Sequence, residues 1–191
     1  MSTKPITILG IPGSLREHSF NRALIRAASG SAPDGVAVHL FLLHDIPLYN
    51  ADVEAQGDPE PVRTLKQAIA DANGVLFSSP QYNASVSGVL KNAVDWASRP
   101  AFESVLADKP VAIIGATSGR SATEKSRAEL MNILHSTRSR VMESPTIGVS
   151  QSGEHIEAGV LQTDEVREQI RRMLGDFAVF IRGHALAEAA D

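Results

Sequence analysis

The feature that most constrains the fold is a regular alternation of short apolar runs with amphipathic helical segments. Residues 6–11 and 74–78 are almost continuously apolar, as expected of strands covered on both faces. Further strands are predicted at 36–43 and 111–116, with a weaker one at 146–150. Between and after them, helical patterns begin near Ser19, at 58–60, at 86, at 121–124 and at Thr163. The helices after the first are predicted to end near 72, 98, 139 and Gly183. Asp58 is predicted to cap the helix at 58–60, and Ser121 with Glu124 to form a capping box.

Strands that alternate with helices favour right-handed βαβ units and a parallel sheet. Five strands and five helices suit an α/β three-layer sandwich with a doubly wound, flavodoxin-like strand order of 2-1-3-4-5. We predict one such domain over residues 1–191, with a frayed tail at 185–191. In this order the chain reverses between strands 1 and 3, so a ligand should bind beyond their carboxyl ends. The loops after strands 1, 3 and 4 are therefore the ones that matter for function.

Composition excludes several function classes. The 191 residues include no cysteine, which excludes disulfides, thiolate catalysis, Fe–S clusters and cysteine-based zinc sites. The six histidines have no metal-site spacing, so no metal site is predicted. A net charge of −4 predicts no general attraction to nucleic acid or to an anionic membrane. Neither a secretory signal nor a membrane-spanning stretch is recognisable, so a cytoplasmic location is predicted.

The loop after the first strand combines small polar residues with a helix start. It contains Ser14, Arg16, Ser19 and Asn21, and it leads into a helix whose N-terminal N–H groups suit a phosphate. Arg16 can add a charge-assisted hydrogen bond. The pattern is neither a Walker loop nor a dinucleotide-binding turn. Taken alone, it fits an ordinary turn capped by Ser19 equally well.

The loops after strands 3 and 4 have features that suit a flat ligand. Pro80 stiffens the first loop, backbone groups of 81–83 can read the polar edge of a heterocycle, and Tyr82 offers an apolar wall. The second loop, 115–120, contains small residues that let a ring approach the backbone. Each loop alone is typical of a surface turn. Their convergence at one end of the sheet favours a ligand site.

These residues resemble the NADPH-dependent FMN reductase family of the flavodoxin-like superfamily, which includes quinone, azo-dye and chromate reductases. The family's phosphate loop, Gly-Ser-x-Arg-x-x-Ser-x-Asn, is matched by residues 13–21. Its second motif is matched by Pro80, Tyr82, Asn83, Gly88 and the run 90–96. Leu48-Tyr49-Asn50 with Asp52 is similar to the family's loop after strand 2. The resemblance covers nearly the whole chain.

The resemblance implies an FMN-containing enzyme that takes a hydride from NADPH or NADH and reduces quinones, free flavin or similar small acceptors in ping-pong order. It assigns the phosphate and ribityl chain to Ser14, Arg16, Ser19, Phe20 and Asn21. It assigns the isoalloxazine to Pro80, Gln81, Tyr82 and Asn83, with Thr117 or Ser118 at its polar side. The flavin carries the chemistry, so no catalytic side chain is predicted. A homodimer or homotetramer built around the helix at 86–98, which carries Trp96, is also implied.

Two positions depart from the family pattern: Gln81 replaces the usual Glu, and Ser87 replaces the usual Pro before Gly88. The first departure puts an expected ion pair between subunits in doubt. Three alternatives remain open at this stage. They are an FMN electron carrier without NAD(P)H activity, a flavin-free dimeric scaffold or regulatory module, and a reductase that uses FMN as a diffusing substrate.

Overall fold

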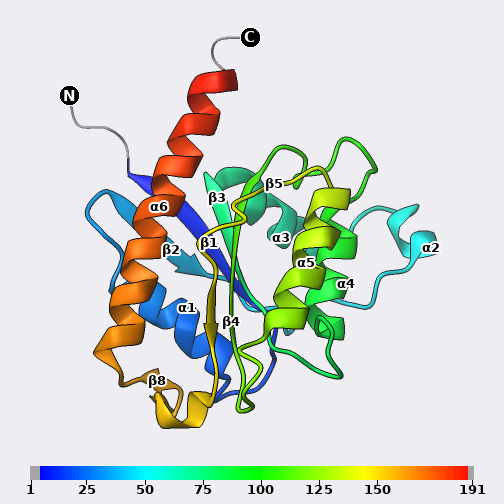
Figure 1. The fold of residues 1–191 in the computed structure, drawn as a ribbon. Helices are drawn as coiled ribbons and strands as arrows, with labels where there is room; N and C mark the ends of the chain where they lie inside the picture. The colour runs from blue at the N-terminus through cyan, green and yellow to red at the C-terminus, as the bar shows by residue number, and fades with distance from the viewer. Residues whose placement is uncertain (1–4, 189–191) are drawn as a thin grey trace.

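A computed structural model describes residues 5–188, with side chains through residue 185. Its centre is a parallel sheet in the order β2-β1-β3-β4-β5, and β6 also pairs with β4 (Figure 1). The predicted α/β flavodoxin-like topology is confirmed. The strands of the sheet are β1 (Ile6–Pro12), β2 (Val36–Leu40), β3 (Gly74–Ser78), β4 (Pro110–Ala116), β5 (Arg140–Val141) and β6 (Ile147–Val149). The helices are α1 (Phe20–Gly30), α2 (Ala51–Glu54), α3 (Glu60–Asp71), α4 (Gly88–Ala97), α5 (Glu124–Ser136) and α6 (Asp164–Glu188).

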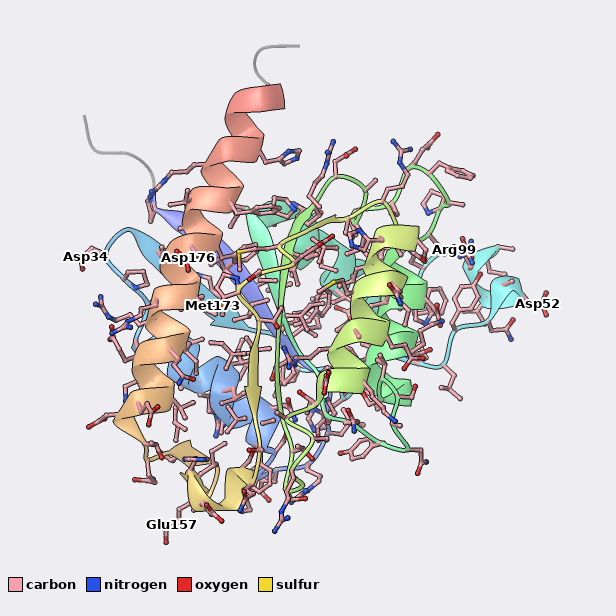
Figure 2. All side chains as sticks on the ribbon, in the orientation of Figure 1. Asp34, Asp52, Arg99, Glu157, Met173 and Asp176 are labelled. Carbon is pink, nitrogen blue, oxygen red and sulfur yellow. The ribbon has the colours of Figure 1, made fainter. Side chains whose placement is uncertain are left out.

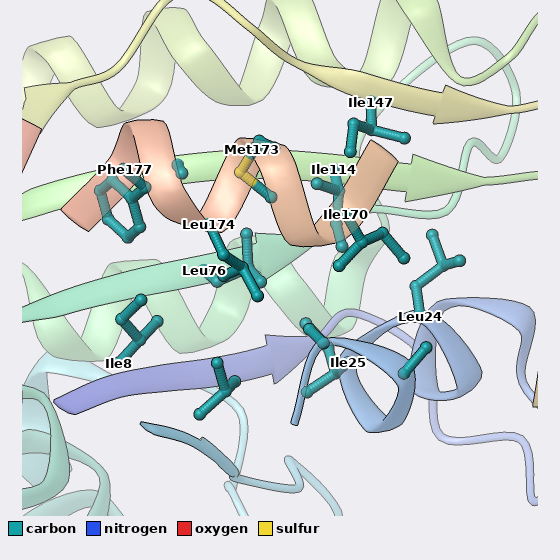
Figure 3. Packing of buried hydrophobic residues seen from close by; sticks show 14 of the residues in the cluster. Ile8, Leu24, Ile25, Leu76, Ile114, Ile147, Ile170, Met173, Leu174 and Phe177 are labelled. Atoms are coloured by element: carbon teal, nitrogen blue, oxygen red, sulfur yellow. The ribbon is translucent and has the colours of Figure 1, made fainter. Parts of the chain in front are cut away.

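Helices cover both faces of the sheet, which explains why its central strands are apolar throughout. On one face, Ile8, Leu76 and Ile114 pack against α1 and α6 (Figure 3). On the other face, Ile11 and Phe77 pack against α3, α4 and α5. Successive residues of each strand point to opposite faces, so two cores form from the same short runs.

The fifth place in the sheet is divided between two short strands. The predicted strand at 146–150 is β6, which pairs with Ile114–Ala116 of β4. A second segment, β5, pairs with Pro110 and Val111 nearer the start of β4. Pro145 lies between the two segments and has no N–H to donate to a ladder, which is consistent with the break.

Two of the predicted helix caps are wrong. The N-cap residue of α3 is Pro59 and not Asp58 as predicted. The Asp58 carboxylate instead forms an ion pair with Lys66 at 2.6 Å. The capping box of Ser121 and Glu124 does not form. Ala122 and Thr123 adopt left-handed backbone angles before α5, and this extra turn moves the Ser121 hydroxyl away from the capping position. Ser19, in contrast, caps α1 as predicted.

The end of the chain also differs from prediction. Helix α6 continues to Glu188, past the predicted end near Gly183, because glycine within a helix costs only about 1 kcal/mol. The frayed tail predicted at 185–191 therefore begins within a helix, and its last three residues lie outside the described part. A 3₁₀ turn (Ser152–Glu154) and a hairpin of β7 (Ile156–Glu157) and β8 (Val160–Leu161) precede α6. Among the helices of residues 5–188, none combines the length and apolar character that crossing a bilayer requires.

Candidate functional site

The three predicted loops meet in one cleft beyond the carboxyl ends of β1, β3 and β4. Its volume is about 170 Å³. Ala116 adds a backbone wall that the sequence did not single out, whereas Asn83 is not among the lining residues. The cleft is lined by Ser14, Arg16, Ser19, Phe20, Asn21, Pro80, Gln81, Tyr82, Ala116, Thr117 and Ser118.

The start of α1 forms one end of this cleft and offers free backbone donors. The Ser19 hydroxyl accepts a hydrogen bond from the Arg22 N–H at 3.3 Å and so caps the helix. No group in the described chain accepts a hydrogen bond from the N–H groups of Phe20 and Asn21. These donors lie at the positive end of the helix dipole, where an anion is stabilised. An anion bound at this end of the cleft would therefore be stabilised.

Arg16 supplies the positive charge at this end. Its guanidinium lies 5.9 Å from the centre of the Phe20 ring, and the residue is exposed. Within residues 5–185, no carboxylate forms an ion pair with it. The charge is therefore available for a bound anion, and Phe20 limits where the side chain can go.

Asn21 has a role that sequence reasoning did not anticipate. Its side-chain oxygen accepts hydrogen bonds from the Ala116 N–H at 3.0 Å and the Ser78 hydroxyl at 2.9 Å. Its amide nitrogen donates to the Ala116 carbonyl at 2.9 Å. The side chain is 3% exposed. Asn21 thus joins α1 to the ends of β3 and β4, and most of its hydrogen-bonding capacity is used within the protein.

The loop after β3 forms the opposite wall through a tight turn. Tyr82 and Ser85 exchange backbone hydrogen bonds of 3.2 and 3.0 Å, and the central residues Asn83 and Ala84 have φ of 51° and 62°. Positive φ at both central positions is typical of a type I′ turn. Asn83 therefore stands at the exposed tip of the turn. Because the Tyr82 N–H is used in this turn, the donors left for a ligand are those of Gln81 and Asn83.

Gln81 links this wall to the helix that follows β4. Its side-chain oxygen accepts hydrogen bonds from the N–H groups of Lys125 at 3.1 Å and Ser126 at 3.3 Å. Its amide nitrogen donates to the Ser121 hydroxyl at 3.1 Å. Gln81 thereby caps the N-terminus of α5 in place of Thr123, the residue that precedes the helix and makes no side-chain cap. No local sequence pattern predicts this contact, because 40 or more residues separate the partners.

Close backbone packing completes the floor. A Cβ at Gly115 would lie 2.6 Å from the Ser79 carbonyl oxygen, so only glycine fits there. The Thr117 N–H donates to the Val149 carbonyl at 3.0 Å, which ties the loop after β4 to β6. The Thr117 hydroxyl accepts from the Gly119 N–H at 3.2 Å, and Ser118 is exposed.

The motif at 90–96 supports the loop after β2. The Trp96 indole N–H and the Asn92 amide both donate to the Pro47 carbonyl, at 2.9 and 2.8 Å. Trp96 is 0% exposed within the single chain, so its own ring is not free to pack against another subunit. The interpretation of Trp96 as part of an assembly surface is therefore revised.

A second set of contacts fixes the same loop. The Tyr49 hydroxyl donates to Glu54 at 2.7 Å, and this hydrogen bond raises the pKa of Tyr49. The Arg99 guanidinium lies 5.6 Å from the Tyr49 ring centre. Figure 2 shows Arg99 at the end of α4, on the same side of the molecule as Asp52 of α2. The loop that carries α2 is thus anchored firmly to α4.

Comparisons with known proteins identify the family. The sequence pattern of the NADPH-dependent FMN reductases matches residues 6–154, a region that contains all three loops of the cleft. The chain belongs to this family. It is therefore an oxidoreductase that uses FMN and NAD(P)H. The free N–H groups at α1 and the unpaired Arg16 fit the phosphate of FMN.

Individual relatives span nearly the whole chain. An NAD(P)H-dependent FMN reductase of Pseudomonas aeruginosa is 39% identical over 178 residues, which cover 93% of this chain and 96% of that protein. A 2-hydroxy-1,4-benzoquinone reductase of a Burkholderia species is 35% identical, with coverage of 93% and 97%. The structure of a flavoenzyme NAD(P)H:(acceptor) oxidoreductase from Paracoccus denitrificans superimposes with a TM-score of 0.83 at 30% identity, covering 94% of this chain and 98% of the other.

Proposed function

We propose that this reductase holds FMN with its phosphate at the start of α1 and its isoalloxazine along Pro80, Gln81 and Tyr82. The observation that carries the proposal is the set of unused donors at Phe20 and Asn21, placed beside the unpaired Arg16. Ser14 and Ser19 add hydroxyl groups at the same end, and Thr117 and Ser118 face the ring from the loop after β4.

We further propose that the electron acceptors are quinones or similar planar molecules, as the names of several relatives suggest. When bound, FMN supplies the capacity to accept a hydride and to pass reducing equivalents on. The protein residues position it and exclude water from one side. We propose that donor and acceptor use the same exposed face of the flavin in turn, which gives ping-pong kinetics.

The small volume of the cleft, about 170 Å³, supports self-association as a homodimer or homotetramer. Sites for small molecules usually enclose about 300–1,000 Å³, so the cleft of one chain covers only part of a flavin nucleotide. Two exposed side chains could be covered by another chain. Tyr82 lines the cleft and is 50% exposed, and Leu48, on the loop after β2, is 84% exposed. We propose that a second copy of the chain covers these side chains and completes the flavin site.

Steady-state kinetics with NADPH and 1,4-benzoquinone test this function. The proposal predicts quinone-dependent oxidation of NADPH, with parallel lines in double-reciprocal plots at several quinone concentrations. Lines that intersect would contradict the ping-pong order. A flavin that dithionite reduces but that neither NADPH nor NADH reduces would favour an electron carrier and contradict the proposed activity.

A further inference from the structure

Ser87 makes two hydrogen bonds that connect α4 to the phosphate end of the cleft. Its hydroxyl accepts from the Leu90 N–H at 3.3 Å, which caps α4, and it donates to the Gly13 carbonyl at 2.6 Å. The side chain is 3% exposed. Proline, the residue that the family pattern has here, has no hydroxyl and could not make either bond. The contact between Ser87 and Gly13 therefore distinguishes this chain from the family pattern.

The bond to Gly13 fixes the direction of the next N–H group. The peptide between Gly13 and Ser14 is trans, so its C=O and N–H point in opposite directions. Gly13 packs against α4, since a Cβ there would lie 2.9 Å from the Leu90 side chain. With the carbonyl held toward α4, the Ser14 N–H must point the other way, away from Ser87.

The Ser14 N–H has no other use within the described chain. Ser14 is 6% exposed and lines the cleft together with Ser19 and Phe20. None of the described residues accepts a hydrogen bond from this N–H group. A nearly buried backbone donor without a partner is rare in proteins and indicates a ligand atom.

We propose that Ser87 is a positioning residue for the FMN phosphate. By holding the Gly13 carbonyl against α4, it directs the Ser14 N–H into the phosphate end of the cleft, where it joins the donors at the start of α1. This inference rests on the proposed placement of FMN. It assigns to α4 a part in phosphate recognition in addition to its support of the loop after β2.

Three substitutions at Ser87 separate this role from helix capping. Ser87→Gly removes the hydroxyl, but glycine is a tolerable N-cap residue. Ser87→Ala removes the hydroxyl and caps poorly, whereas Ser87→Thr keeps both functions. Dissociation constants for FMN and riboflavin are measured by quenching of flavin fluorescence, and thermal unfolding of the flavin-free protein reports the loss of the cap.

The proposal predicts that Ser87→Gly and Ser87→Ala weaken FMN binding about equally, by roughly five- to tenfold, as expected for one misplaced hydrogen bond. Riboflavin binding should stay within about twofold in both. Ser87→Thr should restore FMN affinity, and the alanine variant should unfold at a lower temperature than the glycine variant. This combination shows that FMN affinity follows the hydroxyl and not the strength of the cap.

Two results would overturn the proposal while leaving the proposed function intact. One is an unchanged preference for FMN over riboflavin in Ser87→Gly, and the other is an equal loss of both ligands. A wild-type protein that binds FMN and riboflavin equally well would instead refute the phosphate site itself, and the role of Ser87 with it. The wild-type ratio therefore distinguishes failure of the inference from failure of the function.

Discussion

Replacing Asn21 with alanine tests whether this residue holds the cleft together or only contacts the cofactor. The change removes three hydrogen bonds, two to Ala116 and one to Ser78, and leaves their partners buried. An unsatisfied buried group costs about 1–3 kcal/mol, and a partly relaxed site lies at the lower end of that range. We therefore expect Asn21→Ala to lower the free energy of unfolding by about 3–5 kcal/mol.

The loss should be measured on the flavin-free protein by urea unfolding, so that cofactor binding does not contribute. Asn132→Ala is the matched control, because Asn132 is exposed on α5. That control should be neutral or slightly stabilising, since alanine has the higher helix propensity. A change of less than about 1 kcal/mol in Asn21→Ala, together with a large loss of FMN affinity, would refute the bridging role.

Three further predictions concern charge, capping and assembly. Arg16→Ala should weaken FMN binding by about 10- to 100-fold while riboflavin binding stays nearly unchanged, as measured by fluorescence titration; an equal loss of both would indicate a purely structural arginine. Gln81→Ala should lower stability in thermal unfolding by about 1–2 kcal/mol because α5 loses its cap. Gln81→Glu should keep wild-type stability, because a carboxylate is favourable at a helix N-terminus. Equal stability of the two variants would contradict the capping role. Wild-type protein should sediment as a dimer or tetramer at micromolar concentration. Leu48→Asp should shift it toward monomer without loss of stability, whereas a wild-type monomer would exclude the proposed assembly.

Sequence reasoning predicted the sheet because the signal was strong and local. The runs at β1, β3 and β4 are buried on both faces. The alternation of strands and helices indicated a parallel sheet, and five strands suited the order 2-1-3-4-5. The position of the cleft could then be predicted, because parallel strands bring the loops after them to one edge of the sheet. Ser19 was also predictable, since a cap depends on residues within one helical turn.

Contacts between distant residues could not be predicted in this way. The bond between Gln81 and α5, and the bridge from Asn21 to Ala116, join segments that are near only after folding. Local patterns also failed where a left-handed turn intervened, as at Thr123 before α5. Both Gln81 and Ser87 stood out as departures from the family pattern, but only the structure shows what each of them contacts.

The proposed function requires FMN to bind in this cleft and to receive a hydride from a nicotinamide cofactor. The most direct measurement is the visible spectrum of the protein, saturated with FMN and freed of excess, before and after NADPH is added under nitrogen. We predict about one FMN per chain, bleaching of its visible band by NADPH or NADH, and return of the band when a quinone is added. A protein that retains no FMN, or a bound FMN whose band neither nicotinamide cofactor bleaches, would contradict the proposed function.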